Sequence, residues 1–256
     1  MGAWITSFIN SIPHEVYGEP FGGAASILLR KDPVQYEVYN DLDQNLVNLF
    51  RVLRDESEEL IRKLESTPYS RVEHRNAFDS SNDPVENARR LIVRYRLSFG
   101  RVEPAKFKTP QSAAFKWRFH KGRPPTRDWE TYLPQLQAAA YRLRQVLLES
   151  VPAADFMRMY DGPDTLFYVD PPYLGRKKNN QYLFEMGEQD HKELIEVLKG
   201  LKARIILSGY DHPAYNPLKE MGWQIQTKTA LDSARNHRQE VLWMSPNCKA
   251  MAAMFE

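Results

Sequence analysis

The chain has 256 residues, of which 42% are hydrophobic and 27% are charged, and its formal net charge is +2. These values are ordinary for a globular protein, so they exclude a disordered chain and a strongly basic or acidic one. A single cysteine, Cys248, excludes an internal disulfide framework and a cysteine-cluster zinc site. The histidines lack metal-ligand spacing, so we expect no metal. Because the sequence shows no secretory leader and no long apolar run, we expect a cytoplasmic protein without a membrane partner.

The first elements predict a turn that can approach a ligand. Apolar residues from Trp4 to Ile12 recur at helical spacing, which indicates an amphipathic helix. Residues 15–29 then read as a strand, a glycine turn and a helix. The turn is Glu19-Pro20-Phe21-Gly22-Gly23. Small residues let the backbone come close to a bound molecule, and the N-terminus of the following helix would offer amide donors.

The next strand ends at an acidic residue. Tyr36 to Tyr39 is rich in strand-forming residues and is followed by Asn40 and Asp41. An acid at this offset after a glycine turn is suited to binding the ribose hydroxyls of a nucleoside cofactor, and Asp41 is the candidate. The fuller glycine pattern of nicotinamide-binding folds and the lysine of a phosphate-binding loop are both missing, which disfavours a dinucleotide and ATP.

The middle of the chain is helical and then strongly basic. Apolar spacing indicates a long helix, or two, over residues 42–64, and Asp83, Pro84 and Glu86 form the start of another. Residues 89–127 contain twelve lysines and arginines but only one acid. A solvated protein face normally mixes both signs, whereas basic side chains interleaved with aromatic ones suit nucleic acid. We therefore predict a DNA-contacting insertion, with the candidate contacts Arg94, Arg101, Lys116, Arg118 and Arg123.

The last part of the chain predicts an α/β sheet. Asp128 is expected to cap a helix whose apolar stripe runs from Tyr132 to Leu147. Strands are expected at residues 165–169, 203–207, 223–230 and 239–244, and a helix is expected from Asp190 to Gly200. The alternation predicts a doubly wound α/β sheet that closes with an antiparallel hairpin.

The strand Thr165-Leu-Phe-Tyr-Val169 ends at Asp170-Pro171-Pro172-Tyr173. Two prolines cannot continue the ladder, so Asp170 is placed at the carboxyl end of a buried strand, where open α/β sheets bind their ligands. Asp-Pro is also an ordinary start for a turn, so this motif alone does not establish catalysis.

Three motifs together resemble a known family. Glu19-Pro-Phe-Gly-Gly23, Asn40-Asp41 and Asp170-Pro-Pro-Tyr173, in this order and with a large insertion between the last two, resemble the Dam-type, alpha-class adenine-N6-specific DNA methyltransferases. The resemblance implies a Rossmann-like methyltransferase sheet with an inserted, mainly helical DNA-recognition domain. Residues 1–55 and 150–256 would form the catalytic domain, and residues 56–149 would form the insertion.

The same resemblance implies a cofactor, a partner and residue roles. S-adenosylmethionine would be the cofactor and double-stranded DNA the substrate. The cofactor would be held by Glu19, Pro20, Phe21, Gly22, Gly23, Asp41, Asp155 and Phe156. The target base would be held by Asp170, Pro171, Pro172 and Tyr173. The family also has a lysine- and glycine-containing segment ahead of the first helix, and we expect either an upstream start that includes it or fewer contacts to the cofactor.

The residue types of the Asp-Pro-Pro-Tyr motif suit this reaction. The exocyclic amine of adenine is a poor nucleophile because its lone pair is delocalised into the ring. Hydrogen-bond acceptors for both amine hydrogens, here the Asp170 carboxylate and the Pro171 carbonyl, favour the attacking form. Tyr173 would stack on a base that has left the duplex, so Tyr173→Phe should be tolerated.

Other functions stay open at this point. Methylation of cytosine N4 or of adenine in RNA would use the same geometry, and a DNA-binding protein with an inactive core would retain the basic insertion. We expect a monomer. Whether a restriction endonuclease acts beside it in a restriction-modification pair is left open.

Overall fold

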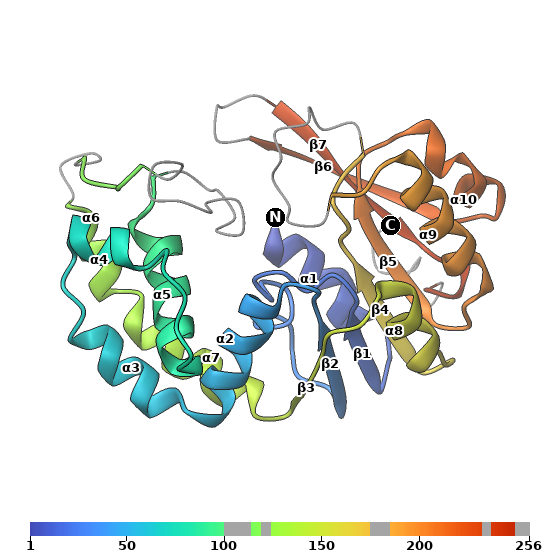
Figure 1. Cartoon of the computed structure of the whole chain (residues 1–256). Coiled ribbons are helices and arrows are strands. Elements are labelled where there is room, and N and C mark those ends of the chain that lie inside the picture. Colours follow the sequence, from blue (N-terminus) through green and yellow to red (C-terminus); the bar gives the residue numbers. More distant parts are fainter. Residues whose placement is uncertain (100–113, 119–123, 175–184, 232–236, 249–256) are drawn as a thin grey trace. The chain divides into compact units, whose positions relative to one another are not determined.

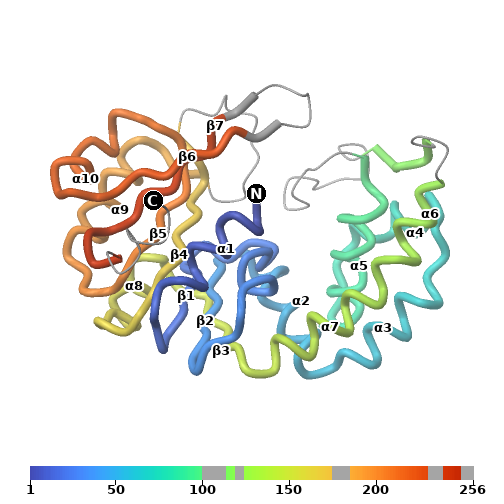
Figure 2. Tube along the Cα trace, turned by 180° about the vertical axis from the view of Figure 1, so that it is seen from behind, coloured from blue at the N-terminus to red at the C-terminus, as the bar shows by residue number. Residues whose placement is uncertain are grey.

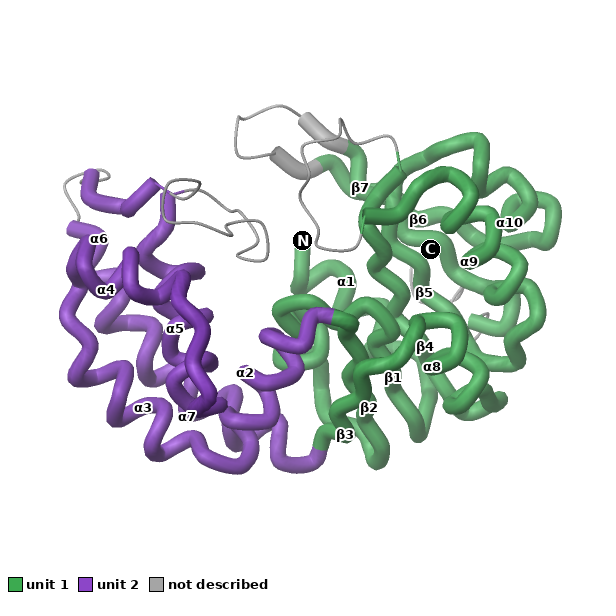
Figure 3. Tube along the Cα trace, viewed as in Figure 1, with its two compact units in different colours: residues 1–42, 146–177, 184–256 green, residues 43–145, 178–183 purple. Residues whose placement is uncertain are grey.

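The computed structural model describes residues 1–99, 114–118, 124–174, 185–231 and 237–248. The chain divides into two compact units (Figure 3). We call residues 1–42, 146–177 and 184–256 the sheet unit, and residues 43–145 and 178–183 the helical unit. The helical unit therefore interrupts the sheet unit in sequence.

The sheet unit is built on a mixed sheet (Figure 1). Among the described residues it has seven strands, in the order β3-β2-β1-β4-β5-β7-β6. The strands are β1 (Val16–Glu19), β2 (Tyr36–Asn40), β3 (Val146–Glu149), β4 (Thr165–Val169), β5 (Arg204–Gly209), β6 (Gln224–Leu231) and β7 (His237–Met244). The first five are parallel, whereas β7 is antiparallel to both β5 and β6. The predicted α/β class and the closing antiparallel hairpin are thus confirmed.

Helices cover both faces of this sheet. The helices are α1 (Gly2–Ser11), α8 (Ala153–Met159), α9 (Glu188–Gly200) and α10 (Asn216–Glu220). Successive side chains of a strand point to opposite faces. Phe167 and Val169 of β4 pack into a core cluster with residues of α8, α9 and α10. Figures 1 and 2 show α9 and α10 beside β5. On the other face, Tyr168 and Leu242 line a pocket together with Ile5 of α1.

The segment after the glycine turn is not the helix that the sequence predicts. Residues 20–31 form successive turns, with helix-like hydrogen bonds from Leu29 N to Ala25 O and from Lys31 N to Ile27 O. Gly23 and Ala25 have positive φ values of 50° and 51°. Backbone in the left-handed region cannot continue a right-handed helix, so the segment stays irregular.

The helical unit packs around α2. Its helices are α2 (Gln44–Asp55), α3 (Ser57–Glu65), α4 (Arg71–Asn76), α5 (Pro84–Leu97), α6 (Pro125–Glu130) and α7 (Leu133–Leu143). Helix α2 contacts α5 and α7, and α3 contacts the same two helices. The predicted start of α5 is confirmed, because the Asp83 side chain accepts a hydrogen bond from Val85 N at 2.9 Å.

Two expectations about the end of this unit are wrong. Asp128 lies within α6 and does not cap the following helix. Helix α7 ends at Leu143, and Leu147 lies on strand β3, which the sequence analysis missed. Leu147 continues the helical apolar spacing by chance. It is 49% exposed because it faces away from the core.

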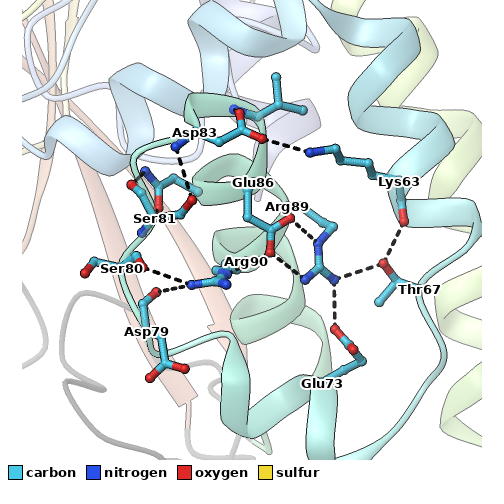
Figure 4. Close-up of polar contacts among 12 residues, drawn as sticks. Lys63, Thr67, Glu73, Asp79, Ser80, Ser81, Asp83, Glu86, Arg89 and Arg90 are labelled. Carbon is cyan, nitrogen blue, oxygen red and sulfur yellow. Dashed lines mark hydrogen bonds and ion pairs between the residues drawn. The ribbon is translucent and has the colours of Figure 1, made fainter.

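A polar cluster joins three helices of the helical unit (Figure 4). The Arg89 guanidinium of α5 binds both carboxylate oxygens of Glu86, at 2.7 and 2.8 Å. It also donates to Glu73 of α4 at 2.9 Å and to Thr67, just beyond α3, at 3.0 Å. Arg90 reaches the same Glu86 carboxylate at 2.8 Å. Because these side chains are mostly buried, the cluster fixes how the three helices pack.

In the part of the chain that the structure describes, no helix combines the length and the apolar character needed to span a membrane.

Candidate active site

The sheet order places the predicted motifs at one edge. Strand β1 pairs with β2 on one side and with β4 on the other, so the connections diverge between β1 and β4. Such a topological switch point leaves a crevice at the carboxyl ends of the strands, where α/β proteins bind ligands. The Glu19–Gly23 turn follows β1, Asp41 follows β2, and Asp170 follows β4. The structure therefore brings together motifs that are 150 residues apart in sequence.

The glycine turn and Asp41 are directly bonded. Gly23 N donates to the Asp41 carboxylate at 2.8 Å, and the Tyr39 hydroxyl donates to Gly23 O at 2.6 Å. A Cβ on Gly23 would meet no atom within 4 Å, so the backbone there faces open space. A Cβ on Gly22 would instead overlap the Tyr39 ring, which is fully buried. Glycine is thus needed at position 22 for close packing and at position 23 for its positive φ.

Asn40 ties this turn to the segment after β3. Its side-chain amide donates to Pro20 O at 2.9 Å and to Val151 O at 3.0 Å, and its oxygen accepts from Val151 N at 2.9 Å. Ser150 Oγ donates to Asp41 O at 2.8 Å. In the sequence, Asn40 stands out only as part of a motif. A fully buried amide at a strand end is instead the anchor of the site.

Asp155 and Phe156 have different surroundings. Asp155 lies in the first turn of α8, is exposed, and pairs with Arg158 at 3.1 Å. Phe156 has an exposed fraction of 0% and packs against the rings of Phe167 and Tyr160. The Phe156 side chain is therefore part of the hydrophobic core, and its contact with the cofactor stays a prediction. Asp155 keeps an accessible carboxylate in the first turn of α8.

A pocket of about 210 Å³ opens beside Asp170. Strand-end residues Tyr168, Asp170, Tyr173 and Ser208 line one part of it. Helix α1, residues Ser26 and Ile27, and β7 with Glu240 and Leu242 complete the lining. Two carboxylates and four hydroxyl groups in one small pocket can hold a polar or positively charged ligand.

Asp170 is the polar centre of this pocket. Burial raises the pKa of Asp170 to about 6, hydrogen bonding from Tyr173 opposes the rise, and the negative charge of Glu240 adds to it. The Tyr173 hydroxyl also lies 2.6 Å from Ser208 Oγ, and the Tyr173 ring meets the Tyr210 ring edge-on at 4.8 Å. The Tyr173 hydroxyl therefore stabilises the charged form of Asp170 by a hydrogen bond. Because Tyr173→Phe removes this bond, we expect the variant to lower activity, in contrast to the tolerance that stacking alone predicts.

Sequence reasoning missed Ser208 and Glu240. Ser208 is the second-to-last residue of β5, the parallel neighbour of β4, and the meeting of parallel carboxyl ends at one edge could have pointed to it. Glu240 lies within β7, where nothing in the local sequence distinguishes it. Only the hairpin register, which pairs Gly209 with Val241, turns the Glu240 side chain toward the pocket.

Glu19 is an unusual acid at the end of β1. It is 2% exposed, and its carboxylate accepts a hydrogen bond from the Tyr17 hydroxyl at 2.8 Å. Burial raises the pKa of Glu19 to about 8, although the Tyr17 bond opposes the rise. Glu19 is consequently protonated at neutral pH and adds no full charge to the crevice. Its contact with the cofactor stays a prediction.

The predicted DNA contacts fall into four groups. Arg94 packs inward over the Phe78 ring, and its buried Nε has no hydrogen-bond partner among the described residues. Lys116 binds the Asp128 carboxylate at 2.7 Å. Arg118 is exposed and lies over the ring of Trp117, 5.4 Å from its centre. Arg101 and Arg123 lie outside the described residues.

Known proteins give two points of comparison. No curated protein matches the sequence. The solved structure of SMU.472, a candidate methyltransferase complexed with SAH, matches with a TM-score of 0.39 and 11% identity, over 96% of this chain and 51% of that chain. This chain therefore spans about half the length of that protein. The family of D12 class N6 adenine-specific DNA methyltransferases matches residues 3–236. With nearly its whole length matched by that family, the chain belongs to the D12 class N6 adenine-specific DNA methyltransferases.

Proposed function

We propose that the protein transfers a methyl group from S-adenosylmethionine to N6 of an adenine in duplex DNA. The observation that carries this proposal is the meeting of the Gly23–Asp41 turn and the Asp170 pocket at one switch point, in a chain of this family. The cofactor, the DNA substrate and a cytoplasmic location all belong to the proposal.

The residues of the crevice fit S-adenosylmethionine. A carboxylate beside a glycine turn suits the ribose hydroxyls, and the open space at Gly23 lets the backbone approach a nucleoside. Asp170 and Glu240 give the neighbouring pocket a negative character, which favours a cationic group. When bound, S-adenosylmethionine supplies a methyl group on positively charged sulfur, and the carbon–sulfur bond that breaks leaves its electron pair on that sulfur.

The chain's own part in the reaction is to hold the adenine amine. The Asp170 carboxylate and the Pro171 carbonyl each accept a hydrogen bond from the N6 amine. These two bonds direct the lone pair of N6 toward the methyl carbon. Adenine leaves the duplex stack to reach this pocket, because its amine cannot approach a buried group while it is paired. The proton lost from N6 passes to Asp170 and then to water, since a carboxylate with a pKa of about 6 accepts a proton and releases it near neutral pH.

The helical unit is proposed to recognise the DNA. Trp117 is 56% exposed next to Arg118, so an aromatic face and a cation are presented together. This pair suits a base and a neighbouring phosphate.

Methyl transfer can be tested with S-adenosylmethionine labelled on its methyl group. Unmethylated duplex DNA and structured RNA should be incubated separately with the protein and then digested to nucleosides. We expect label in N6-methyladenine from DNA, and loss of that label with Asp170→Asn, which keeps the shape of the side chain but removes the charge. Label in N4-methylcytosine or in RNA would replace the proposed substrate, and no label in any nucleoside would favour a DNA-binding protein with an inactive core.

A further inference from the structure

The Asp170–Tyr173 turn has few backbone groups by which it can be fixed. Pro171 and Pro172 carry no N–H group. At these two positions, only the carbonyl oxygen can form a backbone hydrogen bond. A turn that must place a carboxylate and a carbonyl around one amine needs a fixed position, because a displacement of about 1 Å costs roughly 100-fold in rate. The Tyr173 hydroxyl fixes one end of the turn through Ser208, and a group that binds a proline carbonyl fixes its middle.

His191 of α9 makes this contact. Its Nε2 lies 2.8 Å from Pro172 O, and its Nδ1 lies 2.9 Å from the Tyr215 hydroxyl. The imidazole has an exposed fraction of 0%. Tyr215 is also buried and packs against the Trp243 ring at 5.6 Å. The contact thus links the turn to the core of the sheet unit.

The start of α9 sets the position of His191. The Asp190 carboxylate accepts a hydrogen bond from Gly187 N at 2.7 Å, which fixes the first turn of the helix. His191 N then bonds to Gly187 O at 3.2 Å. The imidazole is therefore carried by an ordered helix end, one residue after the capping acid.

The partners determine the protonation of His191. A carbonyl oxygen can only accept, so Nε2 must carry a proton, and the neutral ring then accepts from the Tyr215 hydroxyl at Nδ1. Burial lowers the pKa of His191, and the bond to Pro172 only partly opposes this effect. The charged or titratable groups facing it are Asp190, His212 and Tyr215. The ring is consequently neutral at pH 7, in one tautomer.

We propose that His191 is a positioning residue for methyl transfer: its Nε2–H holds the Pro172 carbonyl and thereby keeps Asp170 and Pro171 in place around the adenine amine. This inference rests on the proposed function. Tyr215 assists this positioning, because its hydroxyl fixes the orientation and the tautomer of the His191 ring.

The test compares two substitutions at the same position. His191→Gln can still place an amide N–H near Pro172 O, whereas His191→Leu keeps the bulk but removes the donor. With labelled S-adenosylmethionine and duplex DNA, we expect His191→Gln to keep kcat within about threefold and His191→Leu to lose roughly 10- to 100-fold. KM for both substrates should stay near the wild-type value, because the turn contributes geometry and not affinity.

Two further measurements separate positioning from general destabilisation. Ile195→Val, a mild core truncation on the same helix, should lower the melting temperature without lowering kcat. In the wild-type protein, NMR of ¹⁵N-labelled histidine should show His191 neutral and protonated at Nε2. Equal kcat losses for His191→Gln and His191→Leu, or a proton on Nδ1 in place of Nε2, would overturn the inference while leaving the proposed function intact. A wild-type protein that methylates no DNA would instead overturn the proposed function, and this role of His191 with it.

Discussion

The ionisation of a single carboxyl group should set the lower pH limit of activity. In the proposed mechanism Asp170 is charged when it accepts hydrogen bonds from the adenine amine, and burial raises its pKa to about 6. We therefore expect kcat/KM to fall about tenfold per pH unit below pH 6. A profile of kcat/KM between pH 4.5 and pH 8 would check this. If kcat/KM began to fall only near pH 4, the prediction would be contradicted.

The same pKa has the opposite effect on stability. Because the folded-state pKa of Asp170 lies above its unfolded value, its contribution to the free energy of unfolding is present below about pH 4 and is lost as pH rises through about 6. The fall in activity at low pH therefore cannot come from unfolding caused by this group. Glu240→Gln provides a matched variant. Removal of its negative charge should lower the pKa of Asp170 and move the activity limb to lower pH.

A second prediction concerns Gly22. Gly22→Ala would press a Cβ into the Tyr39 ring, which is held by the hydrogen bond from its hydroxyl to Gly23 O. The turn must shift, so we expect a loss of about 1–3 kcal/mol in stability and weaker binding of S-adenosylmethionine. Gly200→Ala is the control, because a Cβ there meets nothing within 4 Å. Differential scanning calorimetry and cofactor titration would measure both effects. Equal behaviour of the two variants would mean that the turn tolerates a side chain.

Several elements could be predicted from sequence because local chemistry dictates them. Strand β4 is five buried residues ended by two prolines, and α5 starts at an acid followed by proline. The glycine turn misled the prediction, because apolar residues after Gly23 imitate a helix while Gly23 and Ala25 adopt positive φ. Strand β3 was hidden because Val146 and Leu147 continue the apolar spacing of α7. Its strand pairing with β2 depends on residues more than 100 positions away.

Some residues of the candidate site could likewise be predicted from sequence, and others could not. Asp41 and Asp170 directly follow segments that are rich in strand-forming residues, so their positions could be predicted from sequence. Glu240 and His191 reach the site through hairpin register and helix packing, which a local pattern does not encode.

The packing of α5 gives a prediction for the helical unit. Arg89→Met retains the apolar stem but removes the bonds to Glu86, Glu73 and Thr67, leaving two partly buried carboxylates without this partner. We expect a loss of about 1–3 kcal/mol in the free energy of unfolding. Arg62→Met is the control, because the Arg62–Glu59 pair is exposed and should contribute less to the free energy of unfolding than the Arg89 bonds. Urea unfolding at pH 7 would distinguish the two variants.

This cluster should also respond to acid. Hydrogen bonding from Arg89 lowers the pKa of Glu86 to about 2, below its unfolded value. Its stabilising effect is thus present above about pH 4.5 and is lost as pH falls toward 2. The difference in stability between wild type and Arg89→Met should therefore shrink over that range. A difference that stays constant with pH would show that Arg89 stabilises the unit through packing alone.

At the scale of the whole molecule, each of the two units is stabilised by its own contacts. Contacts that fix the Asp41 turn and the Asp170 pocket lie within the sheet unit, and the Arg89 cluster lies within the helical unit. Substitutions on the surface of the helical unit should therefore change DNA affinity without changing cofactor affinity. This independence gives a test of the DNA-binding surface that we propose on the helical unit.

Trp117→Ala and Arg118→Ala are the variants that test it. Loss of the exposed ring should weaken duplex binding by about 1–3 kcal/mol, and loss of the guanidinium should reduce the salt dependence by about one phosphate contact. Tyr141→Ala is the matched control, because Tyr141 is 74% exposed on α7 and also lies near an arginine, Arg144. Duplex binding should be followed by fluorescence anisotropy at several salt concentrations, with calorimetric titration of the cofactor beside it. If only Tyr141→Ala weakened binding, the DNA would contact a different face of the helical unit. If Trp117→Ala weakened cofactor binding equally, the two units would not act independently.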